Sequence, residues 1–205
     1  MIELDHVLIA VADLEAATRM VEERHRLVSV EGGRHQGLGT ANRIVPLGNT
    51  YLELVAVVDE DEAAESGFGS WVARGELPRL LGWCVRTDDL DAVAARLGAS
   101  VTQGARARPD GTVLRWRMAG LEQSSEEPSL PFFIEWASGT PYPGKAVTQS
   151  ATIEELLLEG DPERVAHWIG DARLPVSIRA GQPALRSVVL GTAGGQAVLD
   201  PSLWP

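Results

Sequence analysis

Hydrophobic residues fill the stretch at 7–11, and this continuous apolar run predicts a buried strand. The pattern changes at Asp13. From there, apolar residues recur at helical spacing, at Leu14, Ala17 and Val21. Aspartate is favoured at the N-cap of a helix, where its side chain accepts hydrogen bonds from free backbone N–H groups. The segment therefore predicts a strand followed by an amphipathic helix that begins after Asp13.

Side chains alternate between the two faces of this predicted strand. One face carries only apolar residues, namely Val7, Ile9 and Val11, and the other carries His6, Leu8 and Ala10. We expect the wholly apolar face to pack beneath the helix. His6 then lies on the concave side of a curved sheet, where a histidine serves either as a structural residue or as part of a site.

The same pattern returns later in the chain. The sequence VADLEAA at 11–17 is echoed by TDDLDAV at 87–93, an offset of 76 residues. A second set of apolar residues at helical spacing follows, and three strand-like stretches come after each predicted helix. A shorter echo begins near residue 151, where Asp161 and Pro162 open a further predicted helix.

These repeats predict an α+β fold in which two βαβββ modules form a cup-shaped mixed sheet. A partial third βαβββ-like unit is expected at the C-terminus. The predicted boundaries are 1–58 for the first module, 59–79 for a linker, 80–138 for the second module, 139–150 for a second linker, and 151–205 for the C-terminal unit. The first linker is acidic and the second is rich in Gly, Pro, Ser and Thr.

Composition narrows the classes of partner. The net charge of −11 disfavours nucleic acid and anionic membrane surfaces, and we expect a small-molecule partner instead. No apolar run approaches the ~20 residues that a membrane span needs, and no secretory signal is evident, so we expect a cytoplasmic protein. The single cysteine, Cys84, lies in an apolar stretch and is expected to be a small buried residue.

Two carboxylates stand out because they interrupt apolar strands. Glu53 lies in TYLELVAV and Glu135 in PFFIEWAS, which are the last strands of the two modules. An unpaired buried carboxylate costs several kcal/mol, so each glutamate must meet a cation, a hydrogen-bond donor or water. A solvated edge position is the alternative for either one.

Five further residues, in three places along the chain, are candidates for a site. His35 lies in a loop between glycines. Its role is either that of a site residue, as a metal ligand, an acid or base or a substrate contact, or that of a hydrogen-bonding residue of the loop. Thr40 and Asn42 share one face of the third predicted strand. Arg115 and Arg117 share a face of the matching strand in the second module, where either arginine binds a substrate oxygen or both balance acidic surface neighbours.

The arrangement resembles the vicinal oxygen chelate superfamily, which includes glyoxalase I, extradiol dioxygenases and bleomycin resistance proteins. It is most similar to the glyoxalase-like domain group, whose GxHxGxGTxNR…YLEL pattern corresponds here to the segment from Gly33 to Arg43 and to Tyr51–Leu54. Superfamily ligands come from the first and fourth strands of each module. The resemblance therefore implies His6, Glu53 and Glu135 as metal ligands, with Gly82 at the fourth position, where glycine cannot ligate.

The resemblance also implies roles for the remaining candidates. A divalent ion such as Mn, Fe, Co, Ni or Zn would suit one imidazole and two carboxylates. His35 and Glu53 are the expected catalytic residues, and the substrate-binding residues would be Thr40, Asn42, Tyr51 and Arg115.

Three functions stay open from the sequence. The first is a metal-dependent lyase, isomerase or dioxygenase that stabilises an oxyanion or enolate of a small oxygenated metabolite. The second is a metal-free protein that sequesters a small molecule in the same cup. The third is a purely structural or interaction module. We expect a monomer or a weak homodimer.

Overall fold

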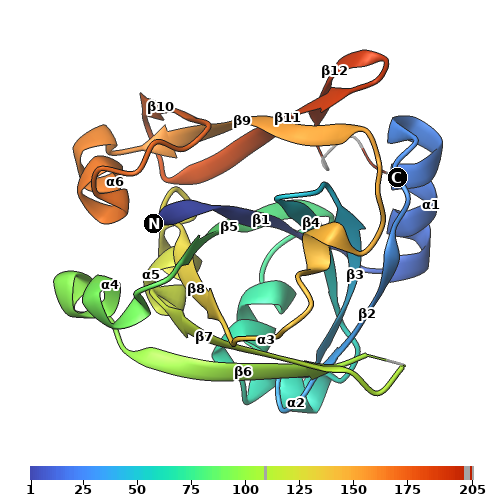
Figure 1. Ribbon diagram of the computed structural model, residues 1–205, viewed down its shortest axis with the longest axis horizontal. Coiled ribbons are helices and arrows are strands. Elements are labelled where there is room, and N and C mark those ends of the chain that lie inside the picture. The colour runs from blue at the N-terminus through green and yellow to red at the C-terminus, as the bar shows by residue number, and fades with distance from the viewer. Residues whose placement is uncertain (109, 201–203, 205) are drawn as a thin grey trace.

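A closed barrel forms the main body of the protein, and a separate sheet covers one side of it (Figure 1). The computed structural model describes residues 1–108, 110–200 and 204. Within these residues the barrel strands follow the order β1-β4-β3-β2-β6-β7-β8-β5, and the second sheet follows the order β10-β9-β11-β12. The predicted α+β class with two βαβββ modules is confirmed, and the expected cup closes into a barrel.

Each module contributes one strand, one helix and three further strands. The first consists of β1 (Ile2–Ala10), α1 (Leu14–His25), β2 (Val30–His35), β3 (Thr40–Pro46) and β4 (Tyr51–Val57). The second consists of β5 (Arg79–Thr87), α4 (Leu90–Leu97), β6 (Val101–Ala107), β7 (Val113–Ala119) and β8 (Phe132–Trp136), with the short helix α5 (Leu121–Glu126) between its last two strands. Asp13 and Asp89 cap α1 and α4 through hydrogen bonds to backbone N–H groups, as the sequence predicts.

The two modules are related by an internal twofold repeat that fixes which positions correspond. β1 and β5 run antiparallel, with Leu8 opposite Gly82 and His6 opposite Cys84. The same repeat makes Gly82 the counterpart of His6, and Cys84 the counterpart of Leu8. In the parallel pairs Leu8 lies opposite Glu53, and Cys84 lies opposite Phe132. Phe132 is therefore the counterpart of Glu53.

The two faces of β1 divide as the alternation predicts. Val7 and Ile9 are fully buried in the main core, together with residues of α1 such as Val21. His6 and Leu8 face the barrel interior instead. The core side of β1 therefore stabilises the fold, and the interior side is left free for a site.

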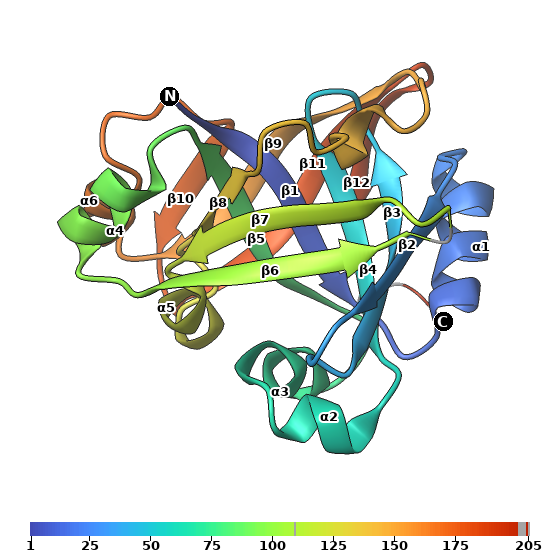
Figure 2. The ribbon, with the colours of Figure 1, turned by 60° about the horizontal axis from the view of Figure 1, so that its bottom comes forward.

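Two short helices occupy the stretch predicted to be a linker. α2 (Glu60–Ala64) and α3 (Gly67–Ala73) lie together at one end of the barrel (Figure 2). Trp71 of α3 packs over Gly82, because a Cβ at that glycine would lie 2.8 Å from the indole ring. The second predicted linker contains one 3₁₀ turn, η1 (Pro143–Lys145). The first linker thus helps to close the barrel.

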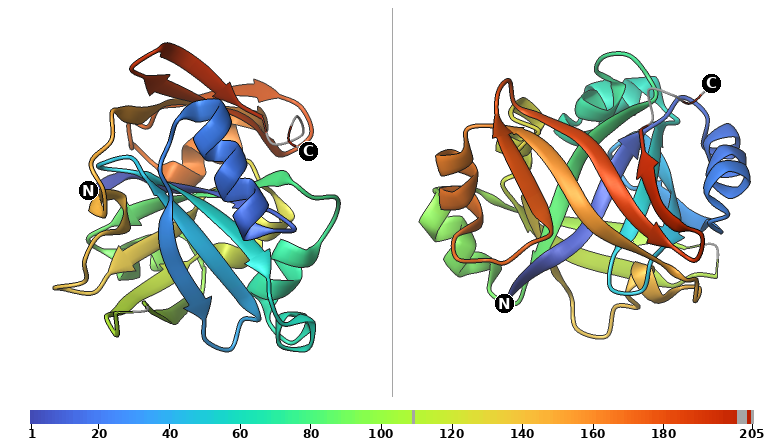
Figure 3. Two further views of the ribbon diagram at one scale, coloured as in Figure 1. Left: turned by 90° about the vertical axis from the view of Figure 1, so that its right-hand side faces the viewer. Right: turned by 90° about the horizontal axis from the view of Figure 1, so that it is seen from above.

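The C-terminal unit repeats the βαβββ order with a different pairing. It consists of β9 (Ala151–Gly160), α6 (Pro162–Ile169), β10 (Val176–Ala180), β11 (Ala184–Thr192) and β12 (Gly195–Leu199). In both barrel modules the first strand lies beside the last, whereas β9 lies between β10 and β11. Its sheet crosses the barrel over β1 and β5 (Figure 3) and joins the main core through Leu156 and Val188. The predicted unit extends to residue 205, and its positions 201–203 and 205 lie outside the described residues.

None of the described helices is long and apolar enough to cross a membrane.

The burial of Ile9 gives a direct test of the packing. We expect Ile9→Ala to lower the free energy of unfolding by about 2–4 kcal/mol, because truncation leaves a cavity in a close-packed core. Urea denaturation followed by circular dichroism measures this loss. Val198→Ala is the matched control, since Val198 is 59% exposed and its truncation is expected to cost less than about 0.5 kcal/mol. Equal losses for the two variants would contradict this packing.

Candidate active site

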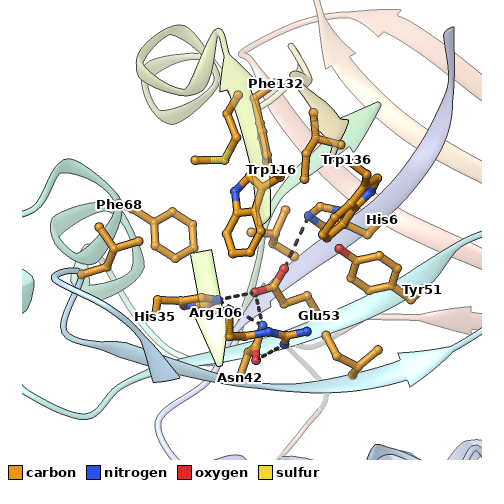
Figure 4. Close-up of a pocket in the computed structure, with 15 residues that line it drawn as sticks. His6, His35, Asn42, Tyr51, Glu53, Phe68, Arg106, Trp116, Phe132 and Trp136 are labelled. Atoms are coloured by element: carbon orange, nitrogen blue, oxygen red, sulfur yellow. Dashed lines mark hydrogen bonds and ion pairs between the residues drawn. The ribbon is translucent and has the colours of Figure 1, made fainter. Parts of the chain in front are cut away.

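A pocket inside the barrel joins a polar half to an apolar half. It holds about 490 Å³ of space not filled by atoms, part of it open to solvent. Polar side chains come mainly from the first module: His6, His35, Asn42, Tyr51 and Glu53. The facing wall is apolar and comes mainly from the second module and α3: Phe68, Trp116, Met118, Phe132, Ile134 and Trp136 (Figure 4). One charged residue of the second module, Arg106 on β6, also lines the pocket.

Glu53 lies at the centre of the polar half. Its Oε2 is 3.4 Å from His6 Nε2, and its Oε1 is 3.5 Å from His35 Nε2. Asn42 Nδ2 donates a hydrogen bond of 2.6 Å to the same Oε1. Glu53 is only 6% exposed, so these contacts replace most of the hydration that the carboxylate would otherwise have. The carboxylate therefore lies between two imidazoles, one at each oxygen (Figure 4).

Arg106 fixes the orientation of Asn42. Its Nη1 donates a hydrogen bond of 2.6 Å to Asn42 Oδ1. A guanidinium has no acceptor atom, so the amide oxygen must face Arg106 and the amide NH₂ must face Glu53. Gly32 makes room for this contact, because a Cβ there would lie 1.9 Å from Asn42 Oδ1 and 2.5 Å from Arg106 Nη1. The close approach of β2 and β6 thus depends on a residue without a side chain.

His6 is oriented by the residue before it. Its Nδ1 lies 2.7 Å from Asp5 Oδ1, and Asp5 is fully buried. Neighbouring strand residues normally point to opposite faces, but the register between β1 and β5 shifts from Leu4 to His6. This bulge leaves Asp5 without a partner in the ladder and lets it reach the imidazole. With Nδ1–H donating to Asp5, Nε2 of His6 faces Glu53, and the ring stacks on Tyr51 at a centroid distance of 4.5 Å.

His35 is a neutral imidazole. Burial lowers its pKa to about 4, and the positive charge of Arg106 adds to this effect, whereas Glu53 opposes it. Asn42 Nδ2 lies 3.2 Å from His35 Nε2, and Thr40 Oγ1 lies 2.8 Å from Nδ1. Since the Asn42 NH₂ faces the ring, we assign Nε2 as the acceptor and Nδ1–H as the donor to Thr40. His35 thus presents a lone pair toward the amide beside Glu53.

The predicted site residues of the first module are brought together. His6, His35, Asn42, Tyr51 and Glu53 all line the pocket. Thr40 lies behind His35 and supports its ring. Strand alternation, the glycines around His35 and the resemblance each singled out part of this set.

The candidates of the second module lie outside it. Glu135 accepts a 3.0 Å hydrogen bond from Arg117 and another from the backbone N–H of Leu90, on the outer side of the barrel. Arg115 also lies on the outer face, because its neighbour Trp116 points inward. The predicted metal set of His6, Glu53 and Glu135 is therefore not assembled. The physical reason is the strand register, which makes Phe132 rather than Glu135 the counterpart of Glu53.

Sequence reasoning missed Asp5 and Arg106. Asp5 becomes part of the site only through the bulge in β1, and no residue pattern in the sequence predicts this bulge. Arg106 had one weak signal, since it stands between Ala105 and Ala107 in a predicted strand and is the largest side chain of that stretch. Trp136, the residue after Glu135, lines the pocket as well and donates from Nε1 to Asp5 Oδ2 at 3.0 Å.

The donor atoms in the pocket do not fit the metal centre that the resemblance implies. Two of its four positions are Gly82 and Phe132, which cannot ligate. His35 does not replace them, because it and His6 lie at opposite oxygens of Glu53, and Asn42 donates to the oxygen on the His35 side. Among the described residues, His6, His35 and Glu53 do not form a group whose ligand atoms all lie within 4.8 Å of one another, as one shared ion would need.

A second buried group could bind a metal ion. Asp5, His6 and Cys84 each place a ligand atom within 4.8 Å of the others. In the structure, however, Asp5 and His6 already satisfy each other through a hydrogen bond. Burial raises the pKa of the Cys84 thiol well above its ordinary value, which disfavours the thiolate that metals bind.

Comparisons with known proteins agree with the architecture. The family model of the glyoxalase-like domain matches residues 4–174. A hypothetical protein from Staphylococcus aureus superposes with a TM-score of 0.76 at 17% identity, covering 94% of this chain and 92% of the other. At this identity the likeness shows the fold alone. A comparison with curated proteins finds no match to this sequence.

Methylmalonyl-CoA epimerases are also among the structural neighbours. The enzyme from Mycobacterium tuberculosis matches with a TM-score of 0.47 at 23% identity, covering 65% of this chain and 86% of the other. A Streptomyces coelicolor epimerase, crystallised with 2-nitronate-propionyl-CoA, matches with a TM-score of 0.49 at 20% identity, covering 67% and 98%. Because the family model covers more than half of the sequence, this chain belongs to the glyoxalase-like domain family.

Proposed function

We propose that the protein is an enzyme that moves a proton on a small oxygenated molecule bound in the barrel pocket, with Glu53 as the base. The observation that carries this proposal is the placement of the Glu53 carboxylate, itself only 6% exposed, between His6 and His35 in the pocket. Two imidazoles and an amide converge on this one carboxylate at the wall of a pocket, an arrangement typical of acid–base sites. This corresponds to isomerase or lyase chemistry rather than to dioxygenase chemistry.

The neighbours of Glu53 supply a path for the proton. Glu53 accepts a proton from the substrate and passes it through Oε2 to His6 Nε2, which lies 3.4 Å away. Asp5 then stabilises the resulting imidazolium through its hydrogen bond to Nδ1. Asn42 keeps the carboxylate in place during the transfer, because its amide is itself held by Arg106.

Arg106 supplies the positive charge that the reaction needs. Removing a proton next to a carbonyl leaves an enolate, whose oxygen must be stabilised by a fixed donor or cation. In the superfamily a ligated metal ion can supply that charge, whereas here the pocket presents a buried guanidinium. We therefore favour proton transfer assisted by Arg106 over the metal-stabilised chemistry that the resemblance implies.

A metal-free binding protein is the second candidate. The apolar half of the pocket favours it, because Gly82 and Phe132 have replaced polar positions and the aromatic wall suits retention of a small molecule. A binding protein would hold its ligand without changing it. The two candidates therefore differ in whether Glu53 exchanges a proton.

Deuterium exchange tests the role of Glu53. We expect the protein in D₂O to catalyse exchange of the protons next to the carbonyl or carboxyl group in a panel of small 2-oxo acids and ketones, monitored by ¹H NMR. Glu53→Gln should slow exchange at least ~100-fold, as is typical for loss of a general base. Glu135→Gln is the matched control and should leave the rate unchanged, since that side chain lies outside the pocket. Exchange at the uncatalysed rate for the whole panel would favour the binding protein.

Metal analysis tests whether an ion takes part. We expect protein purified without chelator to contain less than ~0.1 equivalent of Mn, Fe, Co, Ni or Zn, with no stoichiometric gain on soaking, because a stable site needs more donors than His6 and Glu53 provide. Elemental analysis by mass spectrometry measures the content. One tightly bound ion per chain that is lost in His6→Ala would reinstate the metal-dependent enzyme.

The buried neutral His35 makes stability depend on pH. Its folded pKa of about 4 lies below its unfolded value of about 6.5, so the unfolded state binds the proton more tightly. The stability is present above pH 6.5 and is lost as the pH falls toward 4, by about 3 kcal/mol in total. Urea denaturation of the wild type and of His35→Gln between pH 8 and pH 4 should show a smaller loss in the variant. Parallel curves for the two proteins would contradict this assignment.

A further inference from the structure

Arg106 is a buried cation that forms no ion pair, although the charge of Glu53 acts on it from beyond Asn42. Its side chain is 3% exposed, and its hydrogen bond goes to the neutral amide of Asn42. An ion pair requires a carboxylate oxygen within 4.0 Å of a guanidinium nitrogen, and among the described residues none lies that close to Arg106. Burying a charge without a counter-charge is costly, and buried arginines are normally paired. The protein keeps this arrangement in a pocket, so the missing partner is expected in a ligand.

The charges around Arg106 restrict what that ligand can be. Among the residues that the structure describes, Arg106 is the one Lys or Arg side chain lining the pocket, and Glu53 is held beyond Asn42 on the polar side. A single positive charge matches a monoanion. A phosphate would bring a second negative charge close to Glu53 with no further cation to balance it. A guanidinium also matches the planar carboxylate group, to which it can donate two parallel hydrogen bonds.

The opposite wall restricts the rest of the ligand. Trp116, Trp136, Phe132 and Phe68 present aromatic surface to the same space (Figure 4). Aromatic walls favour an apolar or aromatic body, which gains free energy by leaving water. The pocket therefore combines one anion-binding group with a wall suited to an apolar chain or ring.

We propose that Arg106 binds the carboxylate of a small monocarboxylic acid whose apolar body packs against the aromatic half of the pocket. This assignment deepens the proposed function, on which its catalytic meaning rests, by naming the substrate class. A carboxylate held at Arg106 lies one amide group away from Glu53, because Asn42 bridges the two residues. The carbon atoms next to the carboxylate are thereby presented to the base.

Acids and their uncharged amides provide the test. Butyrate, 4-methylpentanoate and 3-phenylpropionate are compared with the corresponding amides by isothermal titration calorimetry and ligand-observed NMR. We expect each acid to bind the wild type at least ~10-fold more tightly than its amide, with 3-phenylpropionate the tightest of the three. Arg106→Gln should lose that preference while its affinity for the amides stays within ~3-fold. Arg115→Gln, an arginine on the outer face of the same barrel half, should bind as the wild type does.

A stability measurement separates binding from a structural role. If the ligand is the partner of Arg106, Arg106→Met should melt at the same temperature as the wild type or higher, because an unpaired buried charge has been removed. It should also lose the acid preference. A lower melting temperature together with equal losses for acids and amides would show that Arg106 only supports Asn42, and would overturn the proposal.

Two further outcomes would also overturn the proposal that Arg106 binds a carboxylate, and neither requires the protein to be catalytically active. One is equal binding of acids and amides by the wild type, and the other is the absence of binding by every acid. The Glu53→Gln variant distinguishes the catalytic proposal from the binding proposal. It should lose deuterium exchange but still bind acids more tightly than amides. Failure of the exchange assay with the acid preference intact would leave a carboxylate-binding protein and would refute only the catalytic proposal.

Discussion

The hydrogen bond from Arg106 to Asn42 crosses the seam where β2 of one module meets β6 of the other, opposite His35. The rest of the pocket depends on it. A guanidinium fixes which way the Asn42 amide points, and the amide then fixes one oxygen of Glu53 and the acceptor nitrogen of His35. The contact across this seam thus orients the polar half of the site, and Gly32 permits it by having no side chain.

The two modules have diverged in chemistry while keeping one backbone plan. His6 and Glu53 occupy positions whose counterparts are Gly82 and Phe132, so the duplicated framework carries polar groups on one side and apolar groups on the other. Trp71 fills the space that a side chain at position 82 would use. A repeat that could hold an ion between two equivalent halves instead forms a pocket with a polar end and an apolar end. That asymmetry is what orients a ligand.

Sequence patterns predicted the features that depend on interactions between residues close together in the chain. The capping aspartates and the two faces of β1 follow from helical spacing and strand alternation, whereas the site position of Glu53 was implied by the resemblance. Glu135 did not follow, because nearly all of its strand is apolar, and such a pattern fixes neither which face points inward nor its alignment with another strand. Arg106 and the pairing of β9 depend on contacts between distant segments, which no local pattern contains.

Asp5 shows how a small backbone irregularity can couple the two ends of the pocket. The bulge in β1 turns this carboxylate inward, where it accepts from His6 Nδ1 of the polar half and from Trp136 Nε1 of the aromatic half. Arg86 lies 3.8 Å from its other side and balances its charge. Because one fully buried acceptor orients both rings, neither can turn without leaving a buried polar atom unpaired. The position of the His6 imidazole and the shape of the apolar wall are therefore set together by the fold itself.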